Sequence, residues 1–208
     1  EDLGKLKVKK TQSYRDIAKS YKKELRLLDL DKVFMICEIL LQTKIHEETI
    51  IAYQIAYDQR YRYNKQTFDI FEQWLFDYIK DWWDCDDFMT HAFADIIMKY
   101  PHKIDEIKKW VTHERFAVRR SAAVILIRPA QKGELKEKII IEICDLLIND
   151  AHYLVQKGYG WLLKESYKCY KDSVVKYLEQ NVSCMNRIAF RYALEKMDSE
   201  TKQRLMKL

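Results

Sequence analysis

The chain is poor in the residues that break regular structure. Its 208 residues include only four glycines and two prolines, and folds rich in sheet need more of both for their turns. Apolar residues make up 48% of the chain, which is enough for a sizeable buried core. We therefore expect an all-α protein whose helices are joined by short polar loops.

Long apolar runs are also missing. The longest, such as 124–127, are far too short to cross a bilayer. The first four residues are polar and lack the apolar core of a signal peptide. We expect no membrane partner, a cytoplasmic location (near the nucleoid in a bacterium) and a monomer.

Familiar catalytic and metal-binding motifs are absent. The cysteines form no CxxC and no Cys/His pair with metal spacing, so they are predicted to be free, buried thiols; they are Cys37, Cys85, Cys144, Cys169 and Cys184. His46-Glu47-Glu48 is not an HExxH motif, because Ile50 stands where the second histidine would be. There is no glycine-rich phosphate loop and no GxSxG. We expect no metal and no cofactor.

Apolar residues recur at helical spacing along almost the whole chain. The predicted helices cover 13–28, 31–43, 46–61, 66–82, 86–100, 103–112, 115–128, 134–149, 151–168, 172–180, 184–197 and 199–207. Arg128-Pro129 is predicted to end one helix, and Asn149-Asp150 to cap another. No linker divides the chain, so residues 1–208 are predicted to form a single domain.

The sequence also contains an internal repeat. The segment 116–124 resembles 153–161, with aromatic, Val, cationic and small residues in one register 37 positions apart. Such a period is typical of stacked helix pairs, each too small to bury its own apolar face. Because equivalent positions of a solenoid line up on one surface, we predict a stripe along the inner face formed by Glu48, Asp87, Arg120, Lys157 and Arg187.

Acidic and aromatic residues cluster at Trp82-Trp83-Asp84-Cys85-Asp86-Asp87. Aspartates that begin a helix cap it and complement its dipole, which would explain one or two of the three. Two adjacent tryptophans are harder to explain at a helix end. An indole beside a carboxylate is a plausible receptor for a cation, so a catalytic role is the alternative.

Two further motifs lie inside predicted helices. Arg119-Arg120 is a pair of surface cations, or one cation is paired with an acid on a neighbouring helix, or the pair binds phosphate. In the segment 156–161, Gly158 and Gly160 each cost about 1 kcal/mol relative to alanine in a helix. Close helix packing would offset that cost, and so would close approach of another molecule. Trp161 is either core or part of a site.

Taken in order, these motifs resemble the AlkD-type DNA alkylation repair glycosylases from about Tyr14 to Leu208. The resemblance rests on Trp83-Asp84-Cys85-Asp86-Asp87, Arg119-Arg120-Ser121-Ala122, Gln156-Lys157-Gly158-Tyr159-Gly160-Trp161 and Arg191-Tyr192-Ala193-Leu194-Glu195-Lys196. It implies a HEAT-like helical-repeat solenoid whose concave face holds duplex DNA, and release of cationic purines such as 3-methyladenine and 7-methylguanine.

The resemblance also implies roles for single residues. Asp87 takes the place of the catalytic carboxylate, and Trp83 and Trp161 those of the aromatic walls. Arg120 takes the place of the phosphate-binding arginine, and we expect Arg119, Lys157 and Arg187 to contact phosphate as well. The family's earlier helices, with an active-site aromatic, are expected to precede Glu1. Two alternatives stay open: a non-catalytic DNA-binding solenoid and a protein-interaction scaffold.

Overall fold

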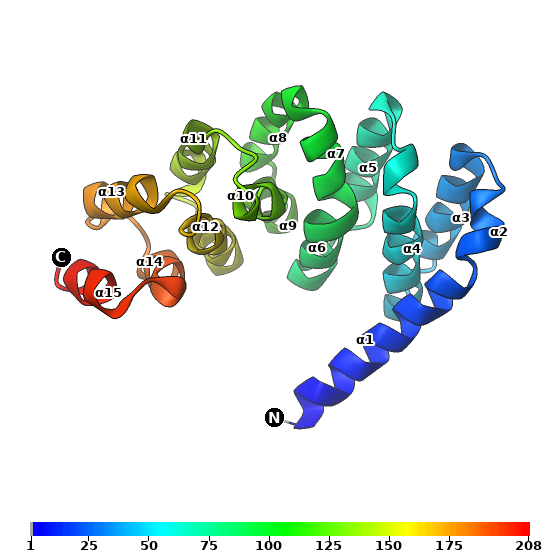
Figure 1. Cartoon of the computed structure of the whole chain (residues 1–208), viewed down its shortest axis with the longest axis horizontal. Coiled ribbons are helices and arrows are strands. Elements are labelled where there is room, and N and C mark those ends of the chain that lie inside the picture. The colour runs from blue at the N-terminus through cyan, green and yellow to red at the C-terminus, as the bar shows by residue number, and fades with distance from the viewer. Residues whose placement is uncertain (1) are drawn as a thin grey trace.

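The computed structural model describes residues 2–208, and side chains from residue 11 onward. Every regular element in that range is a helix and none is a strand, as predicted. The helices stack as antiparallel pairs into a HEAT-like solenoid, which bends into an open arch (Figure 1). No helix among the described residues is long and apolar enough to cross a membrane.

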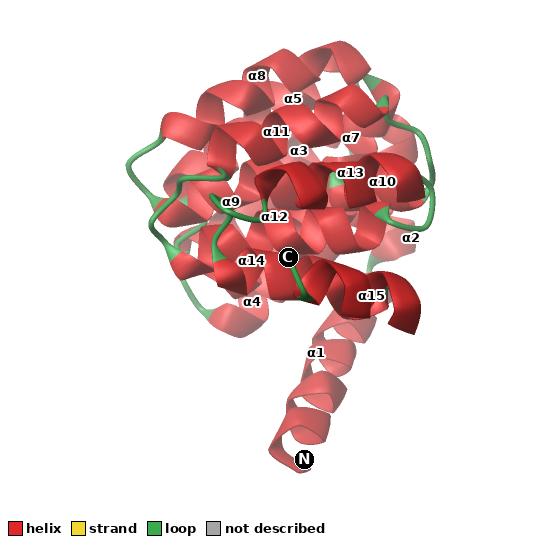
Figure 2. Ribbon diagram, turned by 90° about the vertical axis from the view of Figure 1, so that its left-hand side faces the viewer, coloured by secondary structure: helices red, strands yellow, loops and turns green. Residues whose placement is uncertain are grey.

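The helices form two rows, seen end-on in Figure 2. The outer row contains α3 (Leu30–Gln42), α5 (Lys65–Asp77), α8 (Ile104–Lys109), α11 (Glu137–Leu147) and α13 (Lys171–Asn181). Short 3-10 turns adjoin some of these helices, at Arg60–Arg62, Pro101–Lys103 and Trp110–Thr112. This row forms the outer side of the arch.

The inner row carries the residues of interest. It contains α4 (His46–Asp58), α6 (Trp82–Phe88), α7 (Ala94–Lys99), α9 (Phe116–Val124), α10 (Ile127–Gln131), α12 (Tyr153–Ser166) and α14 (Arg187–Ala193). A π-helical turn, Met89–Phe93, joins α6 to α7, and a 3-10 turn, Leu194–Lys196, follows α14. Neighbouring helices of this row pack directly on one another, as α6 does on α9, α9 on α12 and α12 on α14.

The N-terminal helix lies on the inner side of the arch, and the C-terminus lies at the opposite end of the stack (Figure 1). The helix α1 (Asp2–Ser20) packs on α4 and continues into α2 (Lys22–Arg26), while its first turns project away from the body (Figure 1). At the other end α15 (Ser199–Met206) closes the stack. Because α1 crosses beside α4, its later residues can reach side chains on α6.

Aromatic packing joins the two rows. Phe71 of the outer row lies 5.1 Å, centroid to centroid, from both Trp74 and Phe88, and its ring meets Phe88 edge-on. Phe93 lies 5.5 Å from Trp110. All five rings are buried, and such pairs add about 0.5–1.5 kcal/mol each beyond the burial of their area. This core fixes α6 and its π turn, which carry the candidate site.

Several predicted boundaries are wrong, each for a local reason. The helix α5 ends at Asp77 and α6 begins at Trp82, so this tryptophan opens a helix instead of closing one. Pro129 does not end a helix but lies in the first turn of α10, where its missing N–H is not needed. His152, not Asp150, is the N-cap of α12. The first helix begins at Asp2, eleven residues earlier than predicted.

The cysteines match only part of the prediction. Cys37, Cys85 and Cys144 are buried free thiols, while Cys169 and Cys184 are exposed. The two exposed cysteines lie in the connections that follow α12 and α13, outside the apolar faces of those helices. Burial raises the pKa of Cys85 to about 12, so this thiol stays protonated and chemically quiet at neutral pH.

The two glycines of α12 make close helix packing possible. A Cβ on Gly160 would lie 2.7 Å from the carbonyl oxygen of Ala189 and 3.0 Å from its Cα, both on α14. A Cβ on Gly158 would lie 3.2 Å from Cγ of Arg120 and 3.7 Å from the carbonyl oxygen of the same residue. The contact at Gly158 needs a shift of only a few tenths of an ångström, whereas the one at Gly160 is too short for a Cβ and lies against backbone, so Gly160 is the glycine that close packing requires.

Gly160→Ala is therefore expected to destabilise the protein by about 1–3 kcal/mol, the usual cost of overpacking. Gly158→Ala is the matched control and should stay within about 1 kcal/mol of wild type, because the gain in helix propensity offsets the adjustment of Arg120. Urea unfolding of both variants measures the difference. Equal stability of the two would contradict the packing argument.

Candidate functional site

The acidic cluster forms the first two turns of α6. Asp81 is the N-cap, and its carboxylate accepts the Trp82 N–H at 2.7 Å. Asp84, Asp86 and Asp87 therefore lie inside the helix. Asp84, in the first turn, complements the helix dipole and accepts a backbone N–H that precedes the helix, so the capping hypothesis holds for this aspartate. It does not explain Asp86 and Asp87. Residues four apart share a helix face, so Trp82 and Asp86 face one side of α6 while Trp83 and Asp87 face another.

Asp87 lies where α6 approaches α1 and α4. The Arg15 guanidinium of α1 donates to its Oδ1 at 2.5 Å. His91, one turn further along, places Nδ1 at 3.3 Å from the same oxygen and 2.9 Å from the Asp87 carbonyl oxygen. The Asp87 side chain remains 17% exposed, so the carboxylate is held in place but can be reached from solvent.

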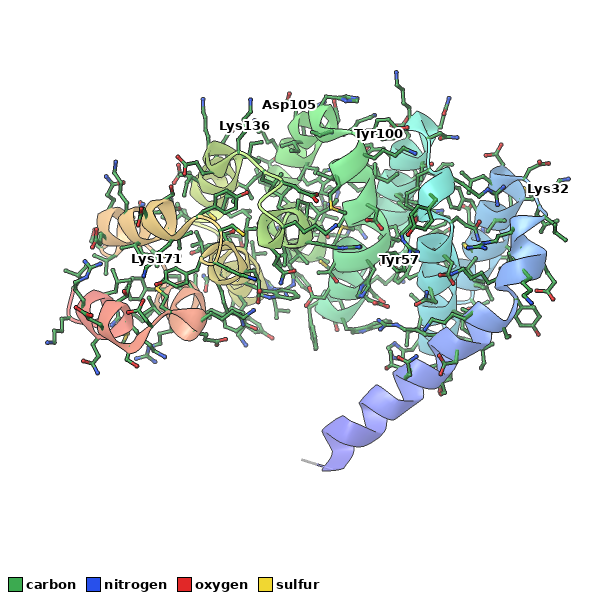
Figure 3. The ribbon with its side chains drawn as sticks, viewed as in Figure 1. Lys32, Tyr57, Tyr100, Asp105, Lys136 and Lys171 are labelled. Carbon is green, nitrogen blue, oxygen red and sulfur yellow. The ribbon has the colours of Figure 1, made fainter. Side chains whose placement is uncertain are left out.

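Two ring pairs join α4 to α6 and to the π-helical turn that follows it. Trp83 meets His46 of α4 edge-on, with ring centroids 4.0 Å apart. Tyr57 of α4, labelled in Figure 3, meets His91 edge-on at 5.7 Å. Motif reasoning found Trp83 but missed His91 and Arg15. The spacing of four between Asp87 and His91 could have revealed the histidine, whereas nothing local links Asp87 to an arginine 72 positions away.

Asp84 differs from its neighbours. It is buried, and its Oδ2 accepts a long hydrogen bond of 3.4 Å from the Lys80 N–H. Burial raises the pKa of Asp84 to about 6, against the opposing effect of backbone hydrogen bonds. Asp84 lines a small cavity with Trp83, away from the inner surface of α9 and α12.

The third aspartate, Asp86, binds Arg120 in a bidentate pair. The guanidinium donates to the two carboxylate oxygens at 2.9 and 2.8 Å and also to the Leu154 carbonyl oxygen of α12. Arg120 is only 5% exposed. Burial alone would lower the pKa of Arg120, but the hydrogen bonds and charge of Asp86 outweigh it and raise the pKa. The pair links α6, α9 and α12.

Arg119 is engaged in a similar way. Its guanidinium binds both oxygens of Asp150, at 2.5 and 3.2 Å, and two backbone carbonyl oxygens at 2.8 Å. The alternative of cations paired with acids on neighbouring segments is thus observed for both arginines. Phosphate contact by Arg119 or Arg120 stays a prediction. A phosphate could bind only to those guanidinium N–H groups that do not already donate to Asp150, Asp86 or a backbone carbonyl oxygen.

Trp161 and Lys157 share a cavity of about 390 Å³ with the Asp86–Arg120 pair. Its remaining walls are Trp82, Tyr153, Leu154 and Tyr192. The structure therefore brings Arg120 and Lys157 together, as the repeat predicted, and places Trp161 beside them. Asp87 lies on the same helix as Asp86 but faces α1, and Trp83 lines a different cavity.

Trp161 is anchored from behind. Its indole N–H donates to Glu165 Oε1 at 3.2 Å, and the other oxygen of Glu165 accepts from Lys196 at 2.5 Å and Gln131 at 2.7 Å. Burial would raise the pKa of Glu165, but these donors lower it overall. Trp161 is thus neither plain core nor a loose surface ring, because its orientation is fixed by an ionised carboxylate.

The outer members of the predicted stripe are less closely linked. Arg187 is exposed at the start of α14, with its guanidinium carbon 5.1 Å from the Phe190 ring centroid. Glu48 is half-buried near the start of α4. Among the described side chains, no hydrogen bond or ion pair joins either residue to Asp87 or Lys157. Their place in the stripe stays a prediction.

The fold and the inner row define a class of protein: a HEAT-like solenoid with acidic, aromatic and cationic side chains on the inner row. Within that class, the chain belongs to the DNA alkylation repair enzyme family, which matches residues 9–197. The resemblance found in the sequence is thereby confirmed, and DNA is the substrate class that membership implies.

A solved structure supports the fold. The chain is similar to a predicted DNA alkylation repair enzyme from Enterococcus faecalis, with a TM-score of 0.78 and 16% sequence identity. The match covers 89% of this chain and 85% of that one. No curated protein gives a significant match in a sequence search.

Proposed function

We propose that the protein is a DNA glycosylase that hydrolyses the N-glycosidic bond of cationic alkylated purines in duplex DNA, such as 3-methyladenine and 7-methylguanine. The observation that carries this proposal is the Asp87 carboxylate, which is fixed on the inner row by Arg15 and His91 yet remains accessible. Incubation with duplex DNA containing 7-methylguanine, followed by measurement of the released base, tests it directly.

The reaction does not need a strong general acid. Alkylation gives the purine a positive charge, so the bond from C1′ to the base nitrogen breaks with its electron pair going to the base. The sugar becomes positively charged. The Asp87 carboxylate stabilises that charge and accepts a proton from the water that attacks C1′. A preorganised group of this kind is typically worth about 3–4 kcal/mol in the transition state.

Arg15 neutralises Asp87 in the free protein, so DNA binding has to displace it. The Arg15 guanidinium is partly exposed and comes from a helix that contacts the inner row mainly through α4. A phosphate near α1 competes with Asp87 for this cation, because phosphate binds a guanidinium in a bidentate way, whereas Asp87 accepts from Arg15 through one oxygen. Entry of the DNA thereby frees the carboxylate at the moment that it is needed.

Selectivity follows from the rings. Trp83, on the same face of α6 as Asp87, attracts a cationic base by about 0.5–2 kcal/mol. A neutral purine gains less from the same ring. Trp161, which lines the cavity beside the Asp86–Arg120 pair, is assigned to DNA next to the alkylated base, so selectivity for positive charge comes from Trp83 and Asp87 without a deep pocket.

Phosphate contacts are assigned chiefly to Lys157 and Arg187, the stripe cations not tied up in ion pairs among the described side chains. Lys157→Ala and Arg187→Ala are each expected to weaken binding to all duplex sequences alike. Each should also reduce the slope of log affinity against log salt by about 0.9. Lys136→Ala, at the outer edge of the arch in Figure 3, is the matched control and should change neither quantity.

Titration of fluorescent duplex DNA at several salt concentrations measures these slopes. If affinity is insensitive to salt, or if Lys136→Ala has the same effect as Lys157→Ala, DNA does not lie on the inner row and a protein-interaction scaffold becomes the better description. A non-catalytic DNA-binding protein is the second candidate, favoured by the Arg15–Asp87 pair. It predicts salt-dependent binding without release of 7-methylguanine.

A further inference from the structure

The most unusual surface feature outside the Asp87 site is the aromatic cavity between α6, α9, α12 and α14. Two of the protein's five tryptophans, Trp74 and Trp110, are core residues. Trp82 instead is 47% exposed, and Tyr153 across the cavity is 52% exposed. Large exposed rings that face one hollow are unfavourable in water and are typical of a binding surface.

The cavity has the chemistry to hold a flat aromatic ligand. Trp82, Tyr153, Trp161 and Tyr192 supply rings from three helices, and the volume of about 390 Å³ falls within the range of about 300–1,000 Å³ seen for ligand sites. The Lys157 ammonium, 5.6 Å from the Tyr153 ring centroid, stands at the same cavity. A planar ring with an attached phosphate fits this combination.

The charge on the cavity wall favours a base over a phosphate. Asp86 contributes a carboxylate there, and Arg120, which pairs with it, is already satisfied by its two carboxylate oxygens. A phosphate placed against Asp86 would be repelled, whereas a nucleobase presents N–H donors that a carboxylate accepts. The Lys157 ammonium then neutralises the phosphate attached to the nucleotide whose base lies in the cavity.

We propose that this cavity is a second nucleic-acid subsite, which receives one unpaired base of the bound DNA by stacking it on Trp82, with Lys157 at the adjoining phosphate. The proposal rests on the proposed function only in placing DNA along the inner row, and it concerns a base other than the one at Asp87. Base–aromatic stacks of this kind depend little on sequence because every base has a π face.

The test compares a fully paired duplex with the same duplex carrying one bulged 2-aminopurine, neither of them alkylated. Wild type is expected to bind the bulged DNA more tightly and to quench the fluorescent base. Trp82→Ala should lose about 5- to 150-fold in affinity for the bulged DNA, the range for one lost stack, together with the quenching. Trp82→Phe should recover part of both, and paired DNA should be affected much less.

Tyr61→Ala is the matched control, because Tyr61 is an exposed ring outside the cavity, and it should behave as wild type. If Trp82→Ala weakens both DNAs equally, or leaves the quenching intact, the subsite is refuted while DNA binding by the inner row stands. If no variant or wild type binds either DNA, the proposed function fails with it. Tight binding of free 2-aminopurine nucleotide without DNA would overturn the assignment to a DNA strand.

Discussion

Asp87→Asn is expected to slow single-turnover base release about 100-fold or more, the effect of losing a preorganised electrostatic group. The asparagine keeps the size of the side chain and one oxygen to accept from Arg15, but it carries no charge to stabilise the sugar. The ion pair that is lost is partly exposed on both sides, so folding should change by no more than about 1 kcal/mol. DNA affinity should be unchanged or slightly higher, since a negative charge near phosphate is removed.

Asp84→Asn is the control from the same helix. Asp84 is buried away from Arg15, and because burial raises its pKa to about 6, a neutral side chain is easily accommodated there. We expect nearly normal rates from this variant. Release of 7-methylguanine is measured for both variants alongside their melting temperatures. Activity of Asp87→Asn equal to wild type would remove the catalytic assignment, and an equal loss in both variants would point to a structural effect.

The second large effect is expected for stability. Asp86→Ala leaves Arg120 buried without its carboxylate, and breaking a buried ion pair costs about 3–5 kcal/mol. Because Asp86 retains some exposure, we expect a value near the lower end. Urea unfolding gives this free energy, and the midpoint should move to lower denaturant with little change in slope.

A double variant separates structure from DNA binding. Replacing Asp86 by Leu and Arg120 by Met removes both charges together, and such replacements of buried pairs are often neutral or stabilising. Stability should therefore recover most of what Asp86→Ala loses. If Arg120 only supports the fold, this variant keeps the wild-type salt slope with duplex DNA. A slope reduced by about 0.9 would show instead that Arg120 contacts phosphate.

The helices were largely predictable because each buries one apolar face. The pattern at α11 or α13 leaves little choice, and the predicted ranges agree with the structure within a few residues. Apolar periodicity gave the wrong helix end near Trp82. Trp74 and Trp82 fit one apolar stripe, so the prediction ran a single helix from 66 to 82, where the structure has two. The turn at Tyr78 to Asp81 contains neither glycine nor proline, and only the cap at Asp81 marks the new helix.

The candidate site was harder to predict than the fold. Sequence spacing placed Arg120 and Lys157 in register, and they do line one cavity, together with Trp161. It could not tell which aspartate binds Arg120, since Asp86 and Asp87 differ only by a rotation of one residue about α6. That rotation determines the partner of each carboxylate. Asp86 is paired with Arg120 inside the stack, and Asp87 faces α1. The contact of Arg15 with Asp87 could not be predicted from the sequence, because it depends on how α1 crosses α4.

The link from Asp86 through Arg120 to the Leu154 carbonyl also has a mechanical consequence. A solenoid bends by small rotations between successive repeats, which touch only their neighbours. This link spans two such junctions at once, joining α6, α9 and α12. We expect the middle of the arch to be stiff and its two arms, before α6 and after α12, to open and close about it. The width of the opening would then be adjusted at the ends, while the spacing between α6 and α12 stays fixed.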